Sequence, residues 1–263
     1  MSDSDRKSTT VSRRDGVVTV TMDRPAVKNA LDDHMFIELV DTFREIADRG
    51  GEDRVVVLTG ANGEFCSGAD LGAPPVIHDR NGPAKIRRLH RLATALHDLP
   101  QPTIARIPGI AAGAGLNLAL GCDLTIASST ARFSAIFAKR GLSTDMGGAW
   151  LLPRLIGLHR AKELALFGDV LSAEQAQDLG LLNRVVAPED LDATVDDWAT
   201  RLAAGPPLAM EHIKRLLNRS FETGFDAQLD TEGVAQSVMF TTKDMAEAMG
   251  AFFEKRTPDF EGR

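Results

Sequence analysis

Apolar residues recur along this chain with two periods, which predict strands in some segments and helices in others. Val17 to Met22 alternates apolar residues with threonine, as in a strand that buries one face. Val55 to Thr59 is a short, almost uninterrupted apolar run of the kind found in strands buried on both faces. Between these runs, apolar residues recur at helical spacing at Phe36, Leu39, Val40, Phe43, Ile46 and Ala47.

The alternation of strands and helices continues to about residue 190. Thr103 to Ile107, Leu124 to Ala127 and Asn183 to Val186 predict three further short strands. Ser172 to Gln175 reads S-A-E-Q, a capping box that predicts the start of a helix. From about Leu191 onward the pattern is helical. We therefore expect an α/β fold followed by a helical extension.

The change of pattern also suggests how the chain is divided. Its polar start, with charges of both signs, predicts a flexible tail over residues 1–12. We expect residues 13–195 to form the core and residues 196–263 to form a helical C-terminal region. No distinct linker separates these two parts, so we expect one domain with an extension.

Composition and charge exclude several classes of function. The chain has 263 residues and a net charge of -7, which argues against nucleic acid as its main partner. No apolar run approaches the length of a membrane span, and the start of the chain does not resemble a signal peptide. Cys66 and Cys122 lie in apolar or small-residue runs and do not indicate a disulfide framework. We expect a cytoplasmic protein that contacts neither membrane nor nucleic acid.

Two glycine-rich turns each follow a predicted buried strand. The first is Gly60 to Leu71, and the second lies within Ile107 to Asp123, which reads I-P-G-I-A-A-G-A-G-L-N-L-A-L-G-C-D. Glycine and alanine let the backbone come close to a neighbouring group, and the first amides of a helix have no partner within it. The two turns can thus direct one N–H each at a shared oxygen on which negative charge develops. Close packing of a helix on a strand is the alternative interpretation.

Other catalytic motifs are absent from the sequence. Neither turn has a phosphate-binding signature, since Leu118 stands where G-x-G-x-x-G requires its last glycine, and no G-x-S-x-G is present. Cys66 and Ser67 have no evident histidine partner, and the histidines lack the spacing of metal ligands. We therefore predict neither nucleophilic catalysis nor a metal site. Gly72 to Pro83 is rich in turn-forming residues, and we interpret it as a loop that acts as a lid.

Asp145 is the candidate acid or base. It lies in Ser143 to Pro153, S-T-D-M-G-G-A-W-L-L-P, just before two glycines and the start of an apolar helix. In one interpretation its side chain caps this helix. In the other it is a carboxylate near the paired amides, where apolar neighbours raise its pKa towards a value useful for proton transfer.

Four motifs, taken in order, resemble the crotonase (enoyl-CoA hydratase/isomerase) superfamily. They are D-R-P-A-V-K-N-A-L (Asp23 to Leu31), F-C-S-G-A-D-L (Phe65 to Leu71), P-G-I-A-A-G-A-G-L-N-L-A-L-G-C-D (Pro108 to Asp123) and G-L-S-T-D-M-G-G-A-W-L-L-P-R-L-I-G (Gly141 to Gly157). The resemblance implies a crotonase-like spiral of ββα units with a C-terminal helical oligomerisation region that forms trimers or hexamers. It also implies an acyl-CoA thioester as substrate, with coenzyme A entering as part of the substrate and no separate cofactor.

The resemblance assigns roles to particular residues. The N–H groups of Ala69 and Ala114 are the expected oxyanion donors. The remaining residues expected at the substrate and coenzyme A are Ala26, Val27, Lys28, Gly68, Asp70, Leu71, Gly113, Asn117, Phe137, Phe252 and Lys255. Among these, Phe252 and Lys255 are expected at the coenzyme A phosphates, either in the same subunit or in a neighbouring one.

Two departures from the family pattern bear on the reaction. Hydratases of this family use two glutamates to activate water, and the resemblance places these at Asn117 and Phe137, neither of which transfers a proton near neutral pH. Asp145 falls where some isomerases of the superfamily keep a catalytic aspartate, and its surroundings most resemble the 1,2-epoxyphenylacetyl-CoA isomerase type.

We therefore expect an isomerase in which Asp145 alone shuttles a proton and moves a double bond. For Asn117, orientation of Asp145 or of the acyl group and simple space filling remain alternatives. Three other functions also stay open: an enoyl-CoA hydratase that uses Asp145, a non-catalytic acyl-CoA-binding protein, and a structural homo-oligomer.

Overall fold

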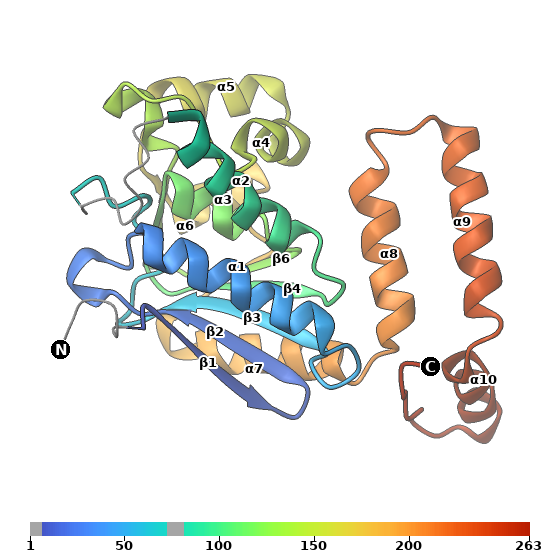
Figure 1. The fold of residues 1–263 in the computed structure, drawn as a ribbon. Coiled ribbons are helices and arrows are strands. Elements are labelled where there is room, and N and C mark those ends of the chain that lie inside the picture. The colour runs from blue at the N-terminus through green and yellow to red at the C-terminus, as the bar shows by residue number, and fades with distance from the viewer. Residues whose placement is uncertain (1–6, 73–81) are drawn as a thin grey trace.

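The structure, a computed structural model, describes residues 7–72 and 82–263 (Figure 1). Its centre is a six-stranded sheet with the order β1-β2-β3-β4-β6-β9. The β1–β2 pair is antiparallel, and every other pair in this sheet is parallel. The strands are β1 (Thr9–Arg14), β2 (Val17–Met22), β3 (Val55–Gly60), β4 (Thr103–Ile107), β6 (Leu124–Ser128) and β9 (Arg184–Val186).

A second sheet is formed by three short strands that alternate along the chain with the later strands of the main sheet. Its order is β5-β7-β8, with β5 parallel to β7 and β7 antiparallel to β8. An isolated bridge between Cys66 and Ala111 joins the turn after β3 to this second sheet. The strands are β5 (Ile110–Ala112), β7 (Arg132–Ser134) and β8 (Leu171–Ser172).

Helices cover both faces of the main sheet, which explains why the first four residues of β3 are apolar. Val56 and Leu58 point into the larger core, which also contains the buried residues of α1 (Asp33–Asp48) and α2 (Gly82–His97). Val55 and Val57 point the other way, into a smaller core with α7 (Leu191–Ala203). Since successive side chains of a strand alternate between faces, a strand covered on both sides has no polar face.

The remaining helices surround the second sheet or extend beyond the core. Asp32 caps α1, and the expected capping box at Ser172 is present at the start of α6. Around the second sheet lie α3 (Ala114–Leu120), α4 (Gly148–Ile156), α5 (Leu158–Phe167) and α6 (Ala173–Leu179). The described residues also form the short 3-10 helices η2 (Pro25–Val27), η3 (Ile136–Arg140) and η4 (Pro188–Asp190).

The last three helices project to one side of the core, and we call residues 206–263 the C-terminal arm (Figure 1). It contains α8 (Pro207–Arg219), α9 (Phe225–Met239) and α10 (Lys243–Glu254). The nearly buried Lys214 of α8 joins the arm to the core. Its Nζ lies 2.8 Å from Asp123 Oδ2 and donates to Gln101 O at 3.0 Å. None of the helices in the described ranges is both long enough and apolar enough to cross a membrane.

Two expected boundaries differ from the structure. The tail predicted over residues 1–12 overlaps β1, because residues 9–14 pair with β2. The core predicted to end at residue 195 extends through α7, since the apolar face of that helix packs on the main sheet. The predicted lid, residues 72–83, lies mostly outside the described residues.

Candidate active site

The two glycine-rich turns lie against each other. Cys66 N–H donates to Ile110 O at 2.9 Å, and Ala112 N–H donates to Cys66 O at 3.0 Å. These bonds align the turn that follows β3 with β5. Gly115, at the start of α3, is close to the same backbone, since a Cβ on it would lie 2.3 Å from Cys66 O. A residue without a side chain is therefore required at this contact.

The N–H groups of Ala69 and Ala114 lie on the two neighbouring turns. Leu31 N–H donates to Gly68 O and Asp70 N–H donates to Leu31 O, so the Ala69 N–H between them points to the opposite side. Ala114 is the first residue of α3, where an N–H has no partner within the helix. A Cβ on Gly68 would lie 3.6 Å from Ala114 N, so the two turns come close together. Within the described ranges neither N–H has an acceptor.

Asp145 lies in the loop that precedes α4. That helix begins at Gly148 and is capped by Gly147 without a side-chain hydrogen bond, so the interpretation of Asp145 as the helix cap is wrong. Met146 and Gly147 both have positive φ, and they separate Asp145 from the helix. The Oδ1 atom of Asp145 is buried and has no hydrogen-bond partner among the described residues.

The surroundings of this carboxyl suit proton transfer. Burial raises the pKa of Asp145 to about 6, and the nearby His90 opposes part of that rise. A carboxyl with this pKa is mostly ionised at neutral pH, yet it holds a proton well enough to return it to a substrate. Nothing in the sequence singled out His90, because its position on α2 is far from Asp145 along the chain.

Asn117 holds the loop that carries Asp145. Its side chain is 1% exposed. Asn117 Nδ2 donates to the backbone oxygen of Asp145 at 2.9 Å and to Thr144 Oγ1 at 3.2 Å. Gly148 leaves room for this contact, since a Cβ there would lie 2.4 Å from Asn117 Nδ2. Asn117 Oδ1 is buried and has no partner in the described part of the chain. The amide thus fastens the loop to α3, and space filling alone does not account for these bonds.

Phe137 lies on the other side of the start of α3. It is buried in η3, and a Cβ on Gly113 would come within 3.9 Å of its Cζ atom. The second position at which the sequence lacks a glutamate is therefore an apolar wall next to Gly113. Asp145 is the acidic residue that the sequence analysis names as the candidate acid or base. Asn117 of α3 donates a hydrogen bond to its backbone oxygen.

Comparison with known proteins agrees with this arrangement. Residues 12–263 match the family model described as enoyl-CoA hydratase/isomerase. The chain is therefore a member of the enoyl-CoA hydratase/isomerase family. It is 40% identical to the 1,2-epoxyphenylacetyl-CoA isomerase of Escherichia coli, over 94% of this chain and 96% of that protein. It is 38% identical to a probable enoyl-CoA hydratase of Rhodobacter capsulatus, over 95% and 96% of the two chains.

The fold is that of the family. A crystal structure of an enoyl-CoA hydratase from Bacillus anthracis superposes with a TM-score of 0.93 at 32% identity, covering 98% of this chain and 100% of that one. The predicted crotonase-type α/β fold with C-terminal helices is thus confirmed. The names of the relatives include both an isomerase and a hydratase, so family membership does not decide between the two reactions.

The segment predicted to hold coenzyme A in this family member lies beside the first turn. Ala26 and Val27 belong to η2, and Lys28 follows it in a left-handed conformation. Ser67 N–H donates to Lys28 O at 3.0 Å, and Ser67 Oγ donates to Val27 O at 3.0 Å. The two predicted coenzyme A segments, residues 26–28 and 68–71, are therefore neighbours in the structure.

Two charged residues that the sequence did not single out fix these segments. Arg24 lies 2.9 Å from Asp70 and 3.2 Å from Asp32, which joins the segment before η2 to the first turn. Glu64 lies 3.0 Å from Lys28 Nζ and accepts from Ile110 N–H at 2.7 Å. Asp70 is far from Arg24 in sequence, and both partners of Glu64 are far from it, so the pattern of one chain gives no signal for these pairs.

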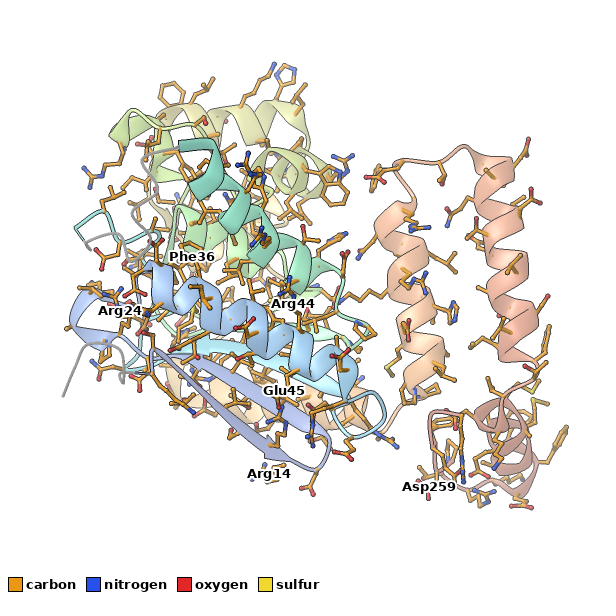
Figure 2. The ribbon with its side chains drawn as sticks, viewed as in Figure 1. Arg14, Arg24, Phe36, Arg44, Glu45 and Asp259 are labelled. Carbon is orange, nitrogen blue, oxygen red and sulfur yellow. The ribbon has the colours of Figure 1, made fainter. Side chains whose placement is uncertain are left out.

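The last predicted residues are Leu71, Phe252 and Lys255. Leu71 is 72% exposed at the edge of the undescribed loop. Phe252 and Lys255 lie at the end of α10, which is in the arm (Figure 1). Figure 2 shows Arg24 on one side of the molecule and Asp259, which follows α10, on the opposite side. Within one protomer the structure does not bring Phe252 and Lys255 to the predicted coenzyme A segments.

Proposed function

We propose that this protein is an acyl-CoA isomerase that moves a double bond with Asp145 as its single proton shuttle. The observation that carries the proposal is the half-buried carboxyl of Asp145, whose Oδ1 atom is buried and whose pKa is raised to about 6. The resemblance to the family puts Asn117 and Phe137, both buried, at the positions of the two hydratase glutamates. Double-bond migration needs one group that removes and returns a proton. Hydration by the family pattern needs two groups that manage water.

The reaction would proceed through an enolate. The thioester oxygen of a 3-enoyl-CoA binds between the N–H groups of Ala69 and Ala114. Asp145 removes a proton from C2, and the electrons move onto the thioester oxygen to give a dienolate. Each N–H donor aimed at that oxygen contributes a few kcal/mol, roughly 3, to the stability of the transition state. Asp145 then returns the proton to C4, which leaves a 2-enoyl-CoA and restores the carboxylate.

The proposal includes the assembly and an alternative substrate. We propose a homotrimer, or a hexamer of two trimers, in which Phe252 and Lys255 reach coenzyme A bound to a neighbouring subunit. The exposed apolar side chains of the arm support this, since Phe225, Phe252 and Phe253 are each more than 70% exposed. An epoxyphenylacetyl-type thioester is the alternative substrate, because the isomerase relative is named for that compound.

The test is incubation with a 3-enoyl-CoA and with a 2-enoyl-CoA in heavy water, followed by mass spectrometry. Migration of the double bond with deuterium at the exchanged carbon is the expected result. A product heavier by one water would instead establish a hydratase, as the relative named a probable hydratase suggests.

The Asp145→Asn variant separates catalysis from binding. It removes the proton acceptor and keeps the shape of the side chain, so turnover should fall by at least about 1,000-fold. Binding of a saturated acyl-CoA should stay within about threefold of wild type, because no proton moves in that complex. Loss of binding to the same degree as turnover would show that Asp145 has a structural role.

A further inference from the structure

The direction of the Ala69 N–H depends on a small contact between two backbone segments. Leu31 pairs with Ala69 in an isolated parallel bridge. Leu31 N–H donates to Gly68 O and Asp70 N–H donates to Leu31 O, both at 2.8 Å. In a planar trans peptide the C=O and the N–H point in opposite directions, so the bond to Gly68 O turns the Ala69 N–H away from Leu31. The expected oxyanion donor is therefore aimed by a bridge of two hydrogen bonds.

This bridge lies outside the two sheets, and Ala69 is exposed. Exposed contacts with few hydrogen bonds open more readily than the strands of a core. An N–H that turns away from its acceptor contributes less to the transition state, because a hydrogen bond weakens steeply as it bends. The rate of a reaction that uses this donor thus depends on what holds the bridge closed.

The guanidinium of Arg24 binds both segments of the bridge. Its Nη1 atom donates to Ala30 O at 2.6 Å, and its Nη2 atom lies 3.2 Å from Asp32 Oδ2, so it contacts the residues on both sides of Leu31. Its Nη2 atom also donates to Asp70 Oδ2 at 2.9 Å, on the opposite segment. One side chain therefore connects the residues that flank the bridge on its two segments.

The carboxylates that bind Arg24 are themselves held in place. Asp32 Oδ1 accepts from Met35 N–H at 2.9 Å and caps α1, and Asp70 Oδ1 accepts from Gly72 N–H at 3.0 Å. The side chain of Arg24 is 18% exposed, and those of both carboxylates are 14% exposed. Ion pairs that are mostly shielded from water are stronger than pairs on the surface. The link from α1 to the first turn is therefore firm.

The guanidinium also offsets negative charge next to the donor. Asp70 follows Ala69 directly, and its carboxylate shares the guanidinium with that of Asp32. Without Arg24, negative charge would remain one residue away from the N–H at which the oxyanion is expected. Like charges repel, and most strongly where water is excluded, so the transition state would be less stable.

We propose that Arg24 is a positioning residue, which holds the Ala69 N–H in line with the thioester oxygen by binding Asp70 and the segment around Leu31. The proposal rests on the proposed function, because it takes that oxygen to lie between the N–H groups of Ala69 and Ala114. Arg24 then acts on the chemical step through the backbone. The competing role, in which the guanidinium binds the coenzyme A phosphates, is an outcome of the test.

Kinetics with two substrates separate these roles. Arg24→Gln should lower kcat for 3-hexenoyl-CoA about 10- to 100-fold, because the donor is no longer held in line. KM should change less than about threefold. The N-acetylcysteamine thioester of the same acid has no phosphates, and its kcat/KM should fall by the same factor. A loss seen with the coenzyme A thioester alone would overturn the proposal in favour of phosphate binding.

Infrared difference spectroscopy tests the donor without turnover. The probe is butyryl-CoA with an isotope label at the thioester carbonyl, bound to the full chain. In the wild type the carbonyl should absorb at lower frequency than in free butyryl-CoA, because N–H donors polarise the bond. In Arg24→Gln most of this shift should disappear, while the Kd stays within about threefold of wild type. An unchanged shift in the variant would overturn the proposal.

A matched arginine shows whether the effect is specific. Arg13 also binds two carboxylates, lying 2.8 Å from Glu45 and 3.1 Å from Asp53. Figure 2 shows Glu45 towards the end of α1 that is farther from Arg24. Arg13→Gln should lower the melting temperature and leave kcat and the carbonyl frequency at their wild-type values. If Arg24→Gln does not fold, Arg24→Lys replaces it, since lysine keeps the charge but cannot bind both segments in the same way.

A double variant tests the route through Asp70. Asp70→Asn should lower kcat in the same way as Arg24→Gln, because each change breaks the same ion pair. The double variant should lose no more than about threefold beyond the larger single effect, since residues that act through one contact are not additive. Losses that multiply would show that Arg24 does not act through Asp70, and would overturn the proposal.

The outcomes also separate this proposal from the proposed function. A carbonyl shift that is lost in Arg24→Gln and kept in Arg13→Gln supports the positioning role, whether or not any substrate is isomerised. Isomerisation together with unchanged kcat and carbonyl frequency in Arg24→Gln would overturn the role of Arg24 and leave the isomerase standing. Equal losses in Arg24→Gln and Arg13→Gln would also overturn that role. A bound carbonyl that is not shifted in the wild type would overturn both proposals.

Discussion

At the scale of single residues, the site depends on one carboxyl group in an unusual place. Asp145 has a buried oxygen without a partner among the described residues and a pKa raised to about 6, chiefly through burial. Leaving a buried acceptor unpaired costs about 1–3 kcal/mol, and such costs tend to persist where a function requires them. Its neighbour His90 acts in the opposite direction, since a positive charge favours the ionised carboxylate.

The pH dependence of activity should report this carboxyl. As a base, Asp145 must be ionised, so kcat/KM should be constant above its pKa of about 6 and fall about tenfold per pH unit below it. His90→Gln removes the charge that lowers this pKa, and it should move the acid limb to higher pH. His159→Gln, on an exposed face of α5, is the control and should leave the limb in place. An acid limb near pH 4 would mean that the carboxyl is solvated like an ordinary aspartate.

Sequence alone identified Asp145 as the candidate but left its role open. The segment S-T-D-M-G-G is compatible with Asp145 as a helix cap and with Asp145 as a catalytic group. In the structure Met146 and Gly147 have positive φ and separate Asp145 from α4, so Asp145 is not the cap. Arg24 and Glu64 could not have been found in this way. Their partners are fixed by the fold, and an arginine or glutamate in a turn is most often simply solvated.

At the scale of elements, the site is made where α3 meets two loops. The start of α3 presents Ala114, while Asn117, one turn later, fastens the loop before α4. The sequence predicted both glycine-rich turns and the helix, because small residues directly after an apolar run are typical of a turn in which the backbone approaches a neighbour closely. It could not show that the amide of Asn117 reaches the backbone of Asp145, since that contact depends on how closely Gly148 approaches.

Breaking the link between α3 and the Asp145 loop should slow the reaction more than it weakens binding. Asn117→Ala removes the donor to Asp145 O and Thr144 Oγ1, so the carboxyl loses its fixed position and kcat should fall about 10- to 100-fold. The Kd of butyryl-CoA should change less than about threefold. Asn117→Asp should in addition shift the acid limb to higher pH, because a second carboxylate disfavours ionisation of Asp145.

A matched variant distinguishes positioning from general destabilisation. Asn183 is an exposed asparagine just before β9, and its side chain accepts from Thr125 N–H at 2.8 Å. Asn183→Ala should lower the melting temperature and leave both kcat and the acid limb near their wild-type values. If Asn183→Ala and Asn117→Ala reduced kcat equally, Asn117 would have no particular role in positioning Asp145.

At the scale of the whole molecule, the arm is anchored to the core but covers little of it. Lys214, with 8% of its side chain exposed, holds α8 against Asp123, and α9 and α10 extend away from the core (Figure 1). The sequence predicted a helical C-terminal region but placed its start too early. The apolar face of α7 is compatible with packing on the core or with packing against another subunit. In the structure it packs on strands of the main sheet, so α7 belongs to the core.

Assembly of the chain is therefore the last prediction. In analytical ultracentrifugation we expect a particle of three times the 28.3 kDa chain mass, or six times for a hexamer. Val234, which is 68% exposed on α9, should lie in the interface, and Val234→Glu should weaken association by burying an unpaired charge. Gln236→Glu adds the same charge two residues further along the helix, on a different face, and is the control.

If dissociation raises the KM for an acyl-CoA, and if Lys255→Ala raises it only in the assembled protein, then α10 completes the coenzyme A site of a neighbour. A fully active monomer with an unchanged KM would show that Phe252 and Lys255 take no part in binding.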